Sequence, residues 1–272
     1  MREEYLSRVP EWYRSFEKFD VVLSDDLDGI VSTSALKFAK NWNVEYFYDF
    51  SKLYVTGKTY FKENKSATRV WADVAITRRE MTFDNHISRK NLGDKLNDLC
   101  INPNVITNVT NENYYDKYCG SSALLIWSLY NIPLPETELG KMLLLCIDST
   151  FKGFFGYNNF KERNRFYLCD VLGFEELYEV EKRHSREEFY ELISKYNLNA
   201  KTTIDKDGYL HTDLDLDFIG KELGIELSIP TDKCFIEWRE LEEHKVNNFY
   251  GDVASIKRLI TLAYTGKNFV KY

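Results

Sequence analysis

The stretch Phe19-Asp20-Val21-Val22-Leu23-Ser24-Asp25-Asp26-Leu27-Asp28-Gly29 decides how the rest of this sequence is interpreted. Its first half is apolar and predicts a buried strand, and an amphipathic helix is predicted over residues 30–41. Asp26 and Asp28 stand two positions apart on the loop between them, so both side chains can face one cation. Gly29 lets the backbone turn sharply into the helix. Asp26 and Asp28 also suit a second role, because aspartate is a favoured helix N-cap.

The composition indicates a globular protein with an acidic surface. The chain has 272 residues, of which 44% are hydrophobic and 29% are charged. That length can bury a large core and suits one large domain, or one domain with a smaller partner. The net charge of −7 does not attract nucleic acid to the whole surface. A phosphate-bearing substrate would therefore have to meet a local basic patch or a metal ion.

The cysteine pattern and the absence of long apolar runs predict a cytoplasmic protein. No two cysteines form a Cys-x-x-Cys pair, so we expect reduced thiols and neither a disulfide framework nor a zinc site. The first residues lack the apolar region of a signal peptide. No apolar run is long enough to span a bilayer, so no membrane partner is expected. The cysteines are Cys100, Cys119, Cys146, Cys169 and Cys234.

The order of the predicted elements indicates an α/β fold with a mainly parallel sheet and flanking helices. Strands are predicted over residues 21–23, 44–50, 70–76 and 81–83, and helices over 30–41 and 113–130. A further helix over 4–18 is interrupted or entered at Pro10, and residues 136–148 form another helix or a buried segment.

Four aspartates come at the ends of these predicted strands, namely Asp26, Asp28, Asp73 and Asp84. In parallel sheets, ligand sites gather at the carboxyl ends of the strands. A further aspartate, Asp148, follows a strongly apolar run, where an unpaired carboxylate would be costly. We therefore expect Asp148 to have a cation or a hydrogen-bond donor as its partner.

The sequence changes in character after about residue 180. We predict a boundary that separates residues 1–185 from a smaller C-terminal α+β subdomain over residues 186–272. A helix is expected over residues 187–196, and Asp205-Lys206-Asp207-Gly208 predicts a hairpin turn and no calcium loop.

Four segments, taken in order, resemble the motifs of the DHH phosphoesterase family. They are Asp26-Leu27-Asp28-Gly29 (its Asp-x-Asp-Gly), Val70-Trp71-Ala72-Asp73 (its lone strand-end Asp), Asp84-Asn85-His86 (its Asp-His-His) and Asp148-Ser149-Thr150 (its late Asp-Thr). The stretch Cys119-Gly120-Ser121-Ser122-Ala123 is similar to the helix start that follows the third motif. The resemblance covers about residues 19–155, and it implies a DHH-like fold whose C-terminal subdomain forms one side of a substrate cleft.

The resemblance implies a phosphodiesterase or nuclease with one or two Mn²⁺ or Mg²⁺ ions, which acts on a short oligonucleotide, a single-strand end or a cyclic dinucleotide. Two such ions activate water and neutralise the phosphoryl oxygens, and they prefer hard oxygen ligands. Asp26, Asp28 and Asp148 would be terminal ligands and Asp73 would bridge the ions. Asn85 would bind weakly through its carbonyl oxygen.

The remaining candidate residues would handle the substrate. By the same resemblance, His86 would contact the scissile phosphate or move a proton, with Asp84 holding its ring. Backbone amides at Gly120, Ser121 and Ser122 would receive a phosphate at a helix start, although small residues there also suit close helix packing. Arg78 and Arg79 would neutralise phosphate charge, or they belong to a solvated charged face.

Departures from the family pattern keep two alternatives open. Val22 and Ser24 stand where the family has a ligand histidine, Asn85 replaces the middle histidine, and the gap from Asp73 to Asp84 is short. A catalytically degenerate protein that binds or sequesters a nucleotide would show such changes. The second alternative is a haloacid-dehalogenase-like phosphatase with Asp26 as nucleophile and Asp28 as general acid.

Overall fold

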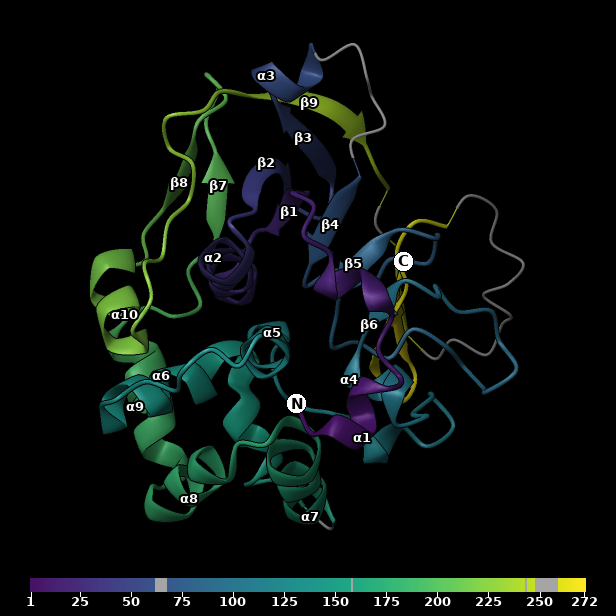
Figure 1. Ribbon diagram of the computed structural model, residues 1–272, viewed down its shortest axis with the longest axis vertical. Helices are drawn as coiled ribbons and strands as arrows, with labels where there is room; N and C mark the ends of the chain where they lie inside the picture. The colour runs from purple at the N-terminus through teal and green to yellow at the C-terminus, as the bar shows by residue number, and fades with distance from the viewer. Residues whose placement is uncertain (62–67, 158, 243, 248–258) are drawn as a thin grey trace.

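A central sheet organises the chain in the computed structural model, which describes residues 1–61, 68–157, 159–242, 244–247 and 259–272. Its seven strands run in the order β6-β5-β4-β1-β2-β3-β9 (Figure 1). They are β1 (Asp20–Ser24), β2 (Asn43–Tyr48), β3 (Lys52–Thr56), β4 (Arg69–Ala72), β5 (Met81–Phe83), β6 (Cys100–Ile101) and β9 (Phe235–Glu240).

The sheet is mostly parallel, as the sequence predicts. Strand β1 pairs in parallel with β2 and β4, and β4, β5 and β6 continue that direction, whereas β3 runs antiparallel to β2 and β9. The chain passes from β1 to β2 on one side and later returns to β4 on the other. The strand order therefore reverses between β1 and β4, which is where open α/β sheets form ligand sites at their carboxyl ends.

Strand β1 is buried on both faces of the sheet. Val21 and Leu23 belong to the main core, while Val22 faces a smaller cluster on the opposite side with Tyr46 and Trp71. All three β1 side chains have no exposed surface. Successive side chains of a strand point to opposite faces, so a continuous apolar run is what this central position requires.

Helices cover the main-core face in two layers (Figure 1). Helices α2 and α5 pack on the strands and on each other, and α6 packs with α8, α9 and α10. The helical elements are α1 (Glu3–Leu6), η1 (Glu11–Arg14), α2 (Leu27–Lys40), α3 (Gly57–Tyr60), α4 (Pro103–Ile106), η2 (Tyr114–Asp116), α5 (Ser122–Leu129), α6 (Glu138–Cys146), η3 (Ile147–Gly153), α7 (Phe160–Arg165), η4 (Phe166–Leu172), α8 (Glu175–Arg183), α9 (Arg186–Lys195) and α10 (Leu216–Leu223).

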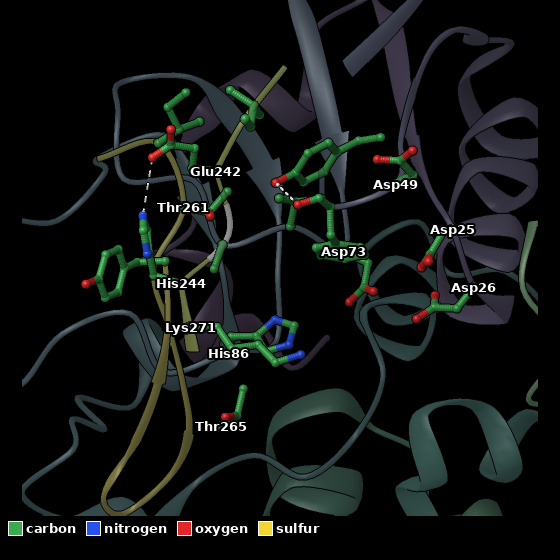
Figure 2. Close-up of a pocket in the computed structure, with 18 of the residues that line it drawn as sticks. Asp25, Asp26, Asp49, Asp73, His86, Glu242, His244, Thr261, Thr265 and Lys271 are labelled. Carbon is green, nitrogen blue, oxygen red and sulfur yellow. Dashed lines mark hydrogen bonds and ion pairs between the residues drawn. The ribbon is translucent and has the colours of Figure 1, made fainter. Parts of the chain in front are cut away.

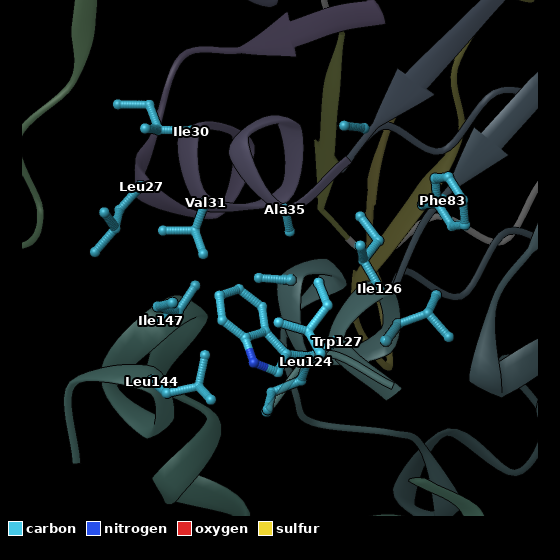
Figure 3. Packing of buried hydrophobic residues seen from close by; sticks show 14 of the residues in the cluster. Leu27, Ile30, Val31, Ala35, Phe83, Leu124, Ile126, Trp127, Leu144 and Ile147 are labelled. Atoms are coloured by element: carbon cyan, nitrogen blue, oxygen red, sulfur yellow. The ribbon is translucent and has the colours of Figure 1, made fainter. Parts of the chain in front are cut away.

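Trp127 on α5 joins the two helical layers. Its side chain is fully buried and lies among apolar residues of α2 and α6, including Val31 and Leu144 (Figure 3). The indole N–H donates to the carbonyl of Pro133 at 3.0 Å, so the ring is buried with its polar atom satisfied.

Two predicted helices are wrong in extent. The helix predicted over 113–130 begins only at Ser122, because Ser121 is its N-cap and accepts a bond from the Leu124 amide at 3.1 Å. The helix predicted over 4–18, interrupted or entered at Pro10, consists of the short elements α1 and η1, and Pro10 is the N-cap of η1. Proline has no amide hydrogen and disfavours a helical residue before it, so the chain changes direction there.

The connection between β4 and β5 is as short as the sequence indicates. The strands pair in parallel, yet only residues 73–80 join them and no helix forms there. Residues near the C-terminus satisfy the backbone of this connection. Leu262 donates to Ala75 at 3.0 Å and Thr77 donates to Ile260 at 2.9 Å.

The C-terminal region contributes to several parts of the fold. Strand β9 joins the central sheet, whereas β7 (Thr202–Ile204) and β8 (Leu210–Thr212) form the predicted hairpin around a turn with Gly208 at φ 87°. Strands β10 (Lys245–Asn247), β11 (Ala263–Gly266) and β12 (Phe269–Lys271) form a separate antiparallel sheet.

The main core includes residues from both sides of the predicted boundary at 185, such as Leu177 and Phe189. The division into two domains stays a prediction. No helix in the described part of the chain is long and apolar enough to cross a bilayer.

Glu181 on α8 is a fully buried carboxyl. One of its oxygens accepts a bond from Asn164, and the other has no partner. Burial raises the pKa of Glu181 well above its usual value, against the smaller opposite effect of Asn164. The folded state thus holds this proton more tightly than the unfolded state. The resulting stabilisation is fully present below the unfolded pKa of about 4.3 and is lost as pH rises through the folded pKa.

We predict that Glu181→Gln raises the free energy of unfolding at about pH 8 and has a smaller effect at about pH 5, because glutamine needs no proton to stay neutral. Urea titrations at both pH values measure the difference. Glu179→Gln on the exposed face of the same helix, where Glu179 pairs with Lys182, is the control. An equal effect of Glu181→Gln at both pH values would contradict the assignment.

Candidate functional site

A cavity of about 820 Å³ opens at the carboxyl ends of β1 and β4. The candidate residues Asp26, Asp73, His86 and Asp148 all line it. Figure 2 shows the carboxylates of Asp26 and Asp73 and the ring of His86 facing the same space. Residues of the C-terminal segment line the opposite wall, among them Glu242, His244, Thr261, Thr265 and Tyr272.

Asp26 has two roles, one for each carboxylate oxygen. As the N-cap of α2, it accepts a bond from the Gly29 amide through Oδ1 at 3.1 Å, which confirms the capping alternative. Its Oδ2 lies 3.3 Å from Lys201 Nζ, and the same ammonium group is 2.8 Å from Asp25 Oδ1. Lys201 was not predicted as a site residue. Its position 175 residues from Asp26 leaves no signal in the local sequence.

Asp28 lies beneath the cavity and binds helix α5. Its two oxygens accept the amides of Ser122 and Ala123, both at 2.8 Å, and Ser32 Oγ donates to one of them at 3.1 Å. Burial, followed by the negative charges of Asp148 and Asp26, raises the pKa of Asp28 to about 7. The residues that line the cavity do not include Asp28, so the structure gives it a helix-capping contact.

Gly29 is required by close packing and not by the sharp turn expected from the sequence. It sits in the first turn of α2 and is not among the residues with positive φ. A Cβ atom at this position would lie 2.2 Å from Ser24 Oγ and 2.7 Å from the Ser24 carbonyl oxygen. The end of β1 therefore lies in close contact with the backbone of α2.

Asp73 directly follows β4 in a left-handed conformation, with φ 61°. Its amide donates to the Phe83 carbonyl at 2.9 Å, and Oδ1 accepts from Ser122 Oγ at 3.0 Å. Only 5% of the residue is exposed. Burial raises the pKa of Asp73 well above its usual value, and the nearby negative charges of Asp28, Asp26 and Asp148 add to the effect. Negative charge is therefore crowded at this point.

Asp148 enters the site through a kink between two helical turns. Asp148 and Ser149 have φ values of 48° and 55°, so the chain leaves the helical direction after α6. Asn85 Nδ2 donates to Asp148 Oδ2 at 2.9 Å and to the Gly120 carbonyl at 3.0 Å. Asp148 is exposed at the cavity, where partial loss of hydration raises the pKa of its carboxyl and the neighbouring His86 opposes that effect. The donor partner expected for this carboxylate is thus Asn85.

The amide oxygen of Asn85 is a buried acceptor without a hydrogen-bond partner. Both contacts of Nδ2 are to oxygen atoms, which fixes the orientation of the amide group. A buried acceptor of this kind needs a donor or a cation. Amide and carboxylate oxygens are ligand types that suit Mg²⁺ or Mn²⁺, although Asn85 itself is not among the residues that line the aspartate cavity.

His86 is oriented by Asp84, as predicted. Its Nδ1 lies 2.8 Å from Asp84 Oδ1, and the second carboxylate oxygen accepts from Asn102 at 2.8 Å. Burial lowers the pKa of His86, but the charge and hydrogen bond of Asp84, with Asp148, outweigh it and raise the pKa above the usual value. Nδ1 is engaged by Asp84, so Nε2 is the ring nitrogen left for a substrate.

The amides at the start of α5 already have acceptors inside the protein. Ser121 donates to Thr150 Oγ1 at 3.2 Å, and Asp28 accepts from Ser122 and Ala123. Ser122 instead acts through its hydroxyl group, which donates to Asp73. The structure brings 120–122 next to the aspartates, but it assigns the Ser121 and Ser122 amides to protein partners.

The two candidate arginines lie at the other end of the sheet. Arg78 and Arg79 precede β5, whereas the site is at the carboxyl ends of the strands. Arg79 pairs with Asp98 at 3.0 Å, and both side chains are exposed. Neither arginine lines the cavity described above, so the structure does not bring them to the aspartates.

No three histidine, cysteine, aspartate or glutamate side chains are already arranged as metal ligands within the described ranges. No family model matches the sequence, and the searches of curated proteins and of solved structures found no match.

We predict that Gly29→Ala destabilises the fold by about 1–3 kcal/mol, the usual cost of forcing extra volume into a packed contact. Thermal or urea unfolding measures the change. Gly57→Ala is the control, because the nearest atom to its new Cβ would lie at an ordinary 3.8 Å. Equal stability of the two variants would contradict the close contact with Ser24.

We expect opposite effects on stability from two aspartate substitutions measured in a chelator. Asp28→Asn removes one of the acceptors that bind the α5 amides and should cost about 1–3 kcal/mol. Asp73→Asn removes a crowded negative charge, keeps an acceptor for Ser122 and should stabilise the metal-free protein at neutral pH. Urea unfolding measures both. If both variants shifted the free energy of unfolding in the same direction, the contrast between a capping role for Asp28 and crowded charge at Asp73 would be wrong.

Proposed function

We propose that the protein is a divalent-metal-dependent phosphodiesterase that acts on a short oligonucleotide, a single-strand end or a cyclic dinucleotide. The observation that carries the proposal is the convergence of three carboxylates, Asp26, Asp73 and Asp148, on one cavity, with the amide of Asn85 bound to Asp148. The resemblance of these segments to the DHH phosphoesterase family supports the same activity.

The charge of the cavity explains why a cation belongs to this activity. A phosphodiester is anionic, and carboxylates alone would repel it. Asp26, Asp73 and Asp148, with the oxygen of Asn85, would hold one or two Mn²⁺ or Mg²⁺ ions. Such an ion activates a water molecule and neutralises the phosphoryl oxygens.

The protein's own residues would position the substrate and the proton. His86 presents Nε2 at the cavity, and its raised pKa keeps the ring protonated at higher pH than a free imidazole. A protonated Nε2 donates to a phosphoryl oxygen or to the leaving oxygen. Asp84 and Asn102 hold the ring, and Lys201 fixes the carboxylates of Asp25 and Asp26. Asp84 is therefore a positioning residue.

A second candidate function is nucleotide binding without cleavage. The hydrogen bond from Asn85 to Asp148 favours it, because this bond joins two of the proposed metal-ligand residues to each other and not to an ion. The phosphatase alternative has less support. Both oxygens of Asp28 accept backbone amides beneath the cavity, so this carboxyl is not placed as a general acid for a leaving group.

We predict Mn²⁺-dependent or Mg²⁺-dependent cleavage of short RNA or DNA oligomers or cyclic dinucleotides, and no cleavage in a chelator. Asp73→Ala should abolish turnover and the thermal stabilisation by Mn²⁺. His86→Gln should lower kcat by about 100-fold or more and leave the stabilisation by Mn²⁺ intact. Product analysis by chromatography measures cleavage, and thermal unfolding measures metal binding.

His211→Gln is the matched control for His86→Gln. His211 pairs with Asp205 at 2.8 Å on the β7–β8 hairpin, a histidine–aspartate pair that does not line the cavity. Metal-dependent binding of a nucleotide without turnover would replace the proposal with the binding function. Cleavage of a phosphomonoester that survives Asp73→Ala and is lost in Asp26→Asn would favour the phosphatase.

A further inference from the structure

We propose that a second cavity beside His86 is a nucleotide subsite, which holds the phosphate and base of a 5′-nucleotide unit next to the reacting phosphate. This inference rests on the proposed function for the identity of that unit. The second cavity has a volume of about 510 Å³, within the range of roughly 300–1,000 Å³ that is typical of small-ligand sites. It shares His86, Asp148 and Thr265 with the aspartate-lined cavity.

The walls of the second cavity come from segments far apart in the sequence. The loop before α5 contributes Lys117 and Tyr118, and η3 contributes Lys152. Tyr157 and Phe160 come from the entry to α7. Arg186 begins α9 and Tyr264 lies on β11, so the predicted C-terminal region closes the cavity.

Three cations give this cavity the opposite charge to the first. Lys117, Lys152 and Arg186 line it, and none of them has a carboxylate within ion-pair distance among the residues with described positions. Three cations around one cavity, none of them neutralised by a carboxylate of a described residue, give it a local positive charge that favours an anion.

Aromatic rings hold these cations in place. Lys152 Nζ lies 5.7 Å from the ring centroid of Tyr190, and the guanidinium carbon of Arg186 lies 5.3 Å from the same ring. Lys117 Nζ lies 5.1 Å from the ring centroid of Tyr114. The three positive groups are therefore positioned before a ligand arrives, which lowers the entropy cost of binding.

Aromatic side chains also line the cavity itself, and they suit a base. Tyr157 is 83% exposed although it is a large ring, and Phe160 and Phe155 lie in the same wall. Stacking on an aromatic ring contributes about 1–3 kcal/mol for each base and tolerates different bases. Phosphate alone would use only the cations, and a nucleoside alone only the rings. A 5′-nucleotide uses both, which is why we assign this ligand.

The test measures binding without turnover. Adenosine 5′-monophosphate, adenosine and inorganic phosphate are titrated into the full chain in a chelator, with calorimetric detection. We expect the nucleotide to bind at least about tenfold more tightly than either part. Lys152→Ala with Arg186→Ala, and separately Tyr157→Ala, should each weaken nucleotide binding by about tenfold. Thermal unfolding verifies that these variants are folded.

The matched control is Lys161→Ala with Lys195→Ala, which removes two exposed cations outside the cavity from α7 and α9, the helices that begin at the lining residues Phe160 and Arg186. Equal weakening by this control, or phosphate binding as tight as nucleotide binding, would overturn the subsite. Metal-dependent hydrolysis together with unchanged nucleotide binding in the Lys152 and Arg186 variant would overturn it and leave the proposed function standing. Specific loss of binding in that variant without any hydrolysis would support the subsite and reject the catalytic proposal.

Discussion

The structure depends on the bond between the carboxylate of Asp28 and the first amides of helix α5. These amides have no acceptor within their own helix, and a buried amide without a partner is costly. Asp28 accepts two of them at 2.8 Å while it sits in the first turn of α2. The bond joins two helices that lie on the same face of the sheet, and it places Ser122 where its hydroxyl reaches Asp73. One buried carboxylate thus connects the motif at Asp26–Gly29, through Ser122, with the motif that ends at Asp73.

The same bond explains why negative charge is concentrated above it. Asp28 is fixed below the cavity, so the carboxylates of Asp73, Asp26 and Asp148 must share the remaining space at the strand ends. Protein donors engage some of their oxygens, among them Ser122, Lys201 and Asn85. This concentration of carboxylates is the charge that the proposed divalent cation would neutralise.

Charge separates the two cavities that meet at His86. The first is lined by carboxylates and opens at the reversal of strand order between β1 and β4. The second is lined by cations and aromatic rings. A nucleotide ester presents a reacting phosphate at one end and a base at the other. Under the proposed function, the metal-loaded first cavity would take the reacting phosphate and the second cavity would take the neighbouring nucleotide unit. His86 and Asp148 line both cavities, and the proposed function would place the bond to be broken beside them.

The sequence by itself determined the buried strand β1, the helix after it, the hairpin at Gly208 and the carboxylates at the strand ends. Each depends on local periodicity or on a residue whose backbone preference acts within a few positions. Only the tertiary structure decided that Asp28 caps α5, that Gly29 touches Ser24 and that Lys201 pairs with Asp26. It also decided that Arg79 faces Asp98 at the opposite end of the sheet, and that α5 begins at Ser122. These contacts join residues distant in the chain or depend on how closely two backbones pack, and neither property leaves a periodic signal in the sequence.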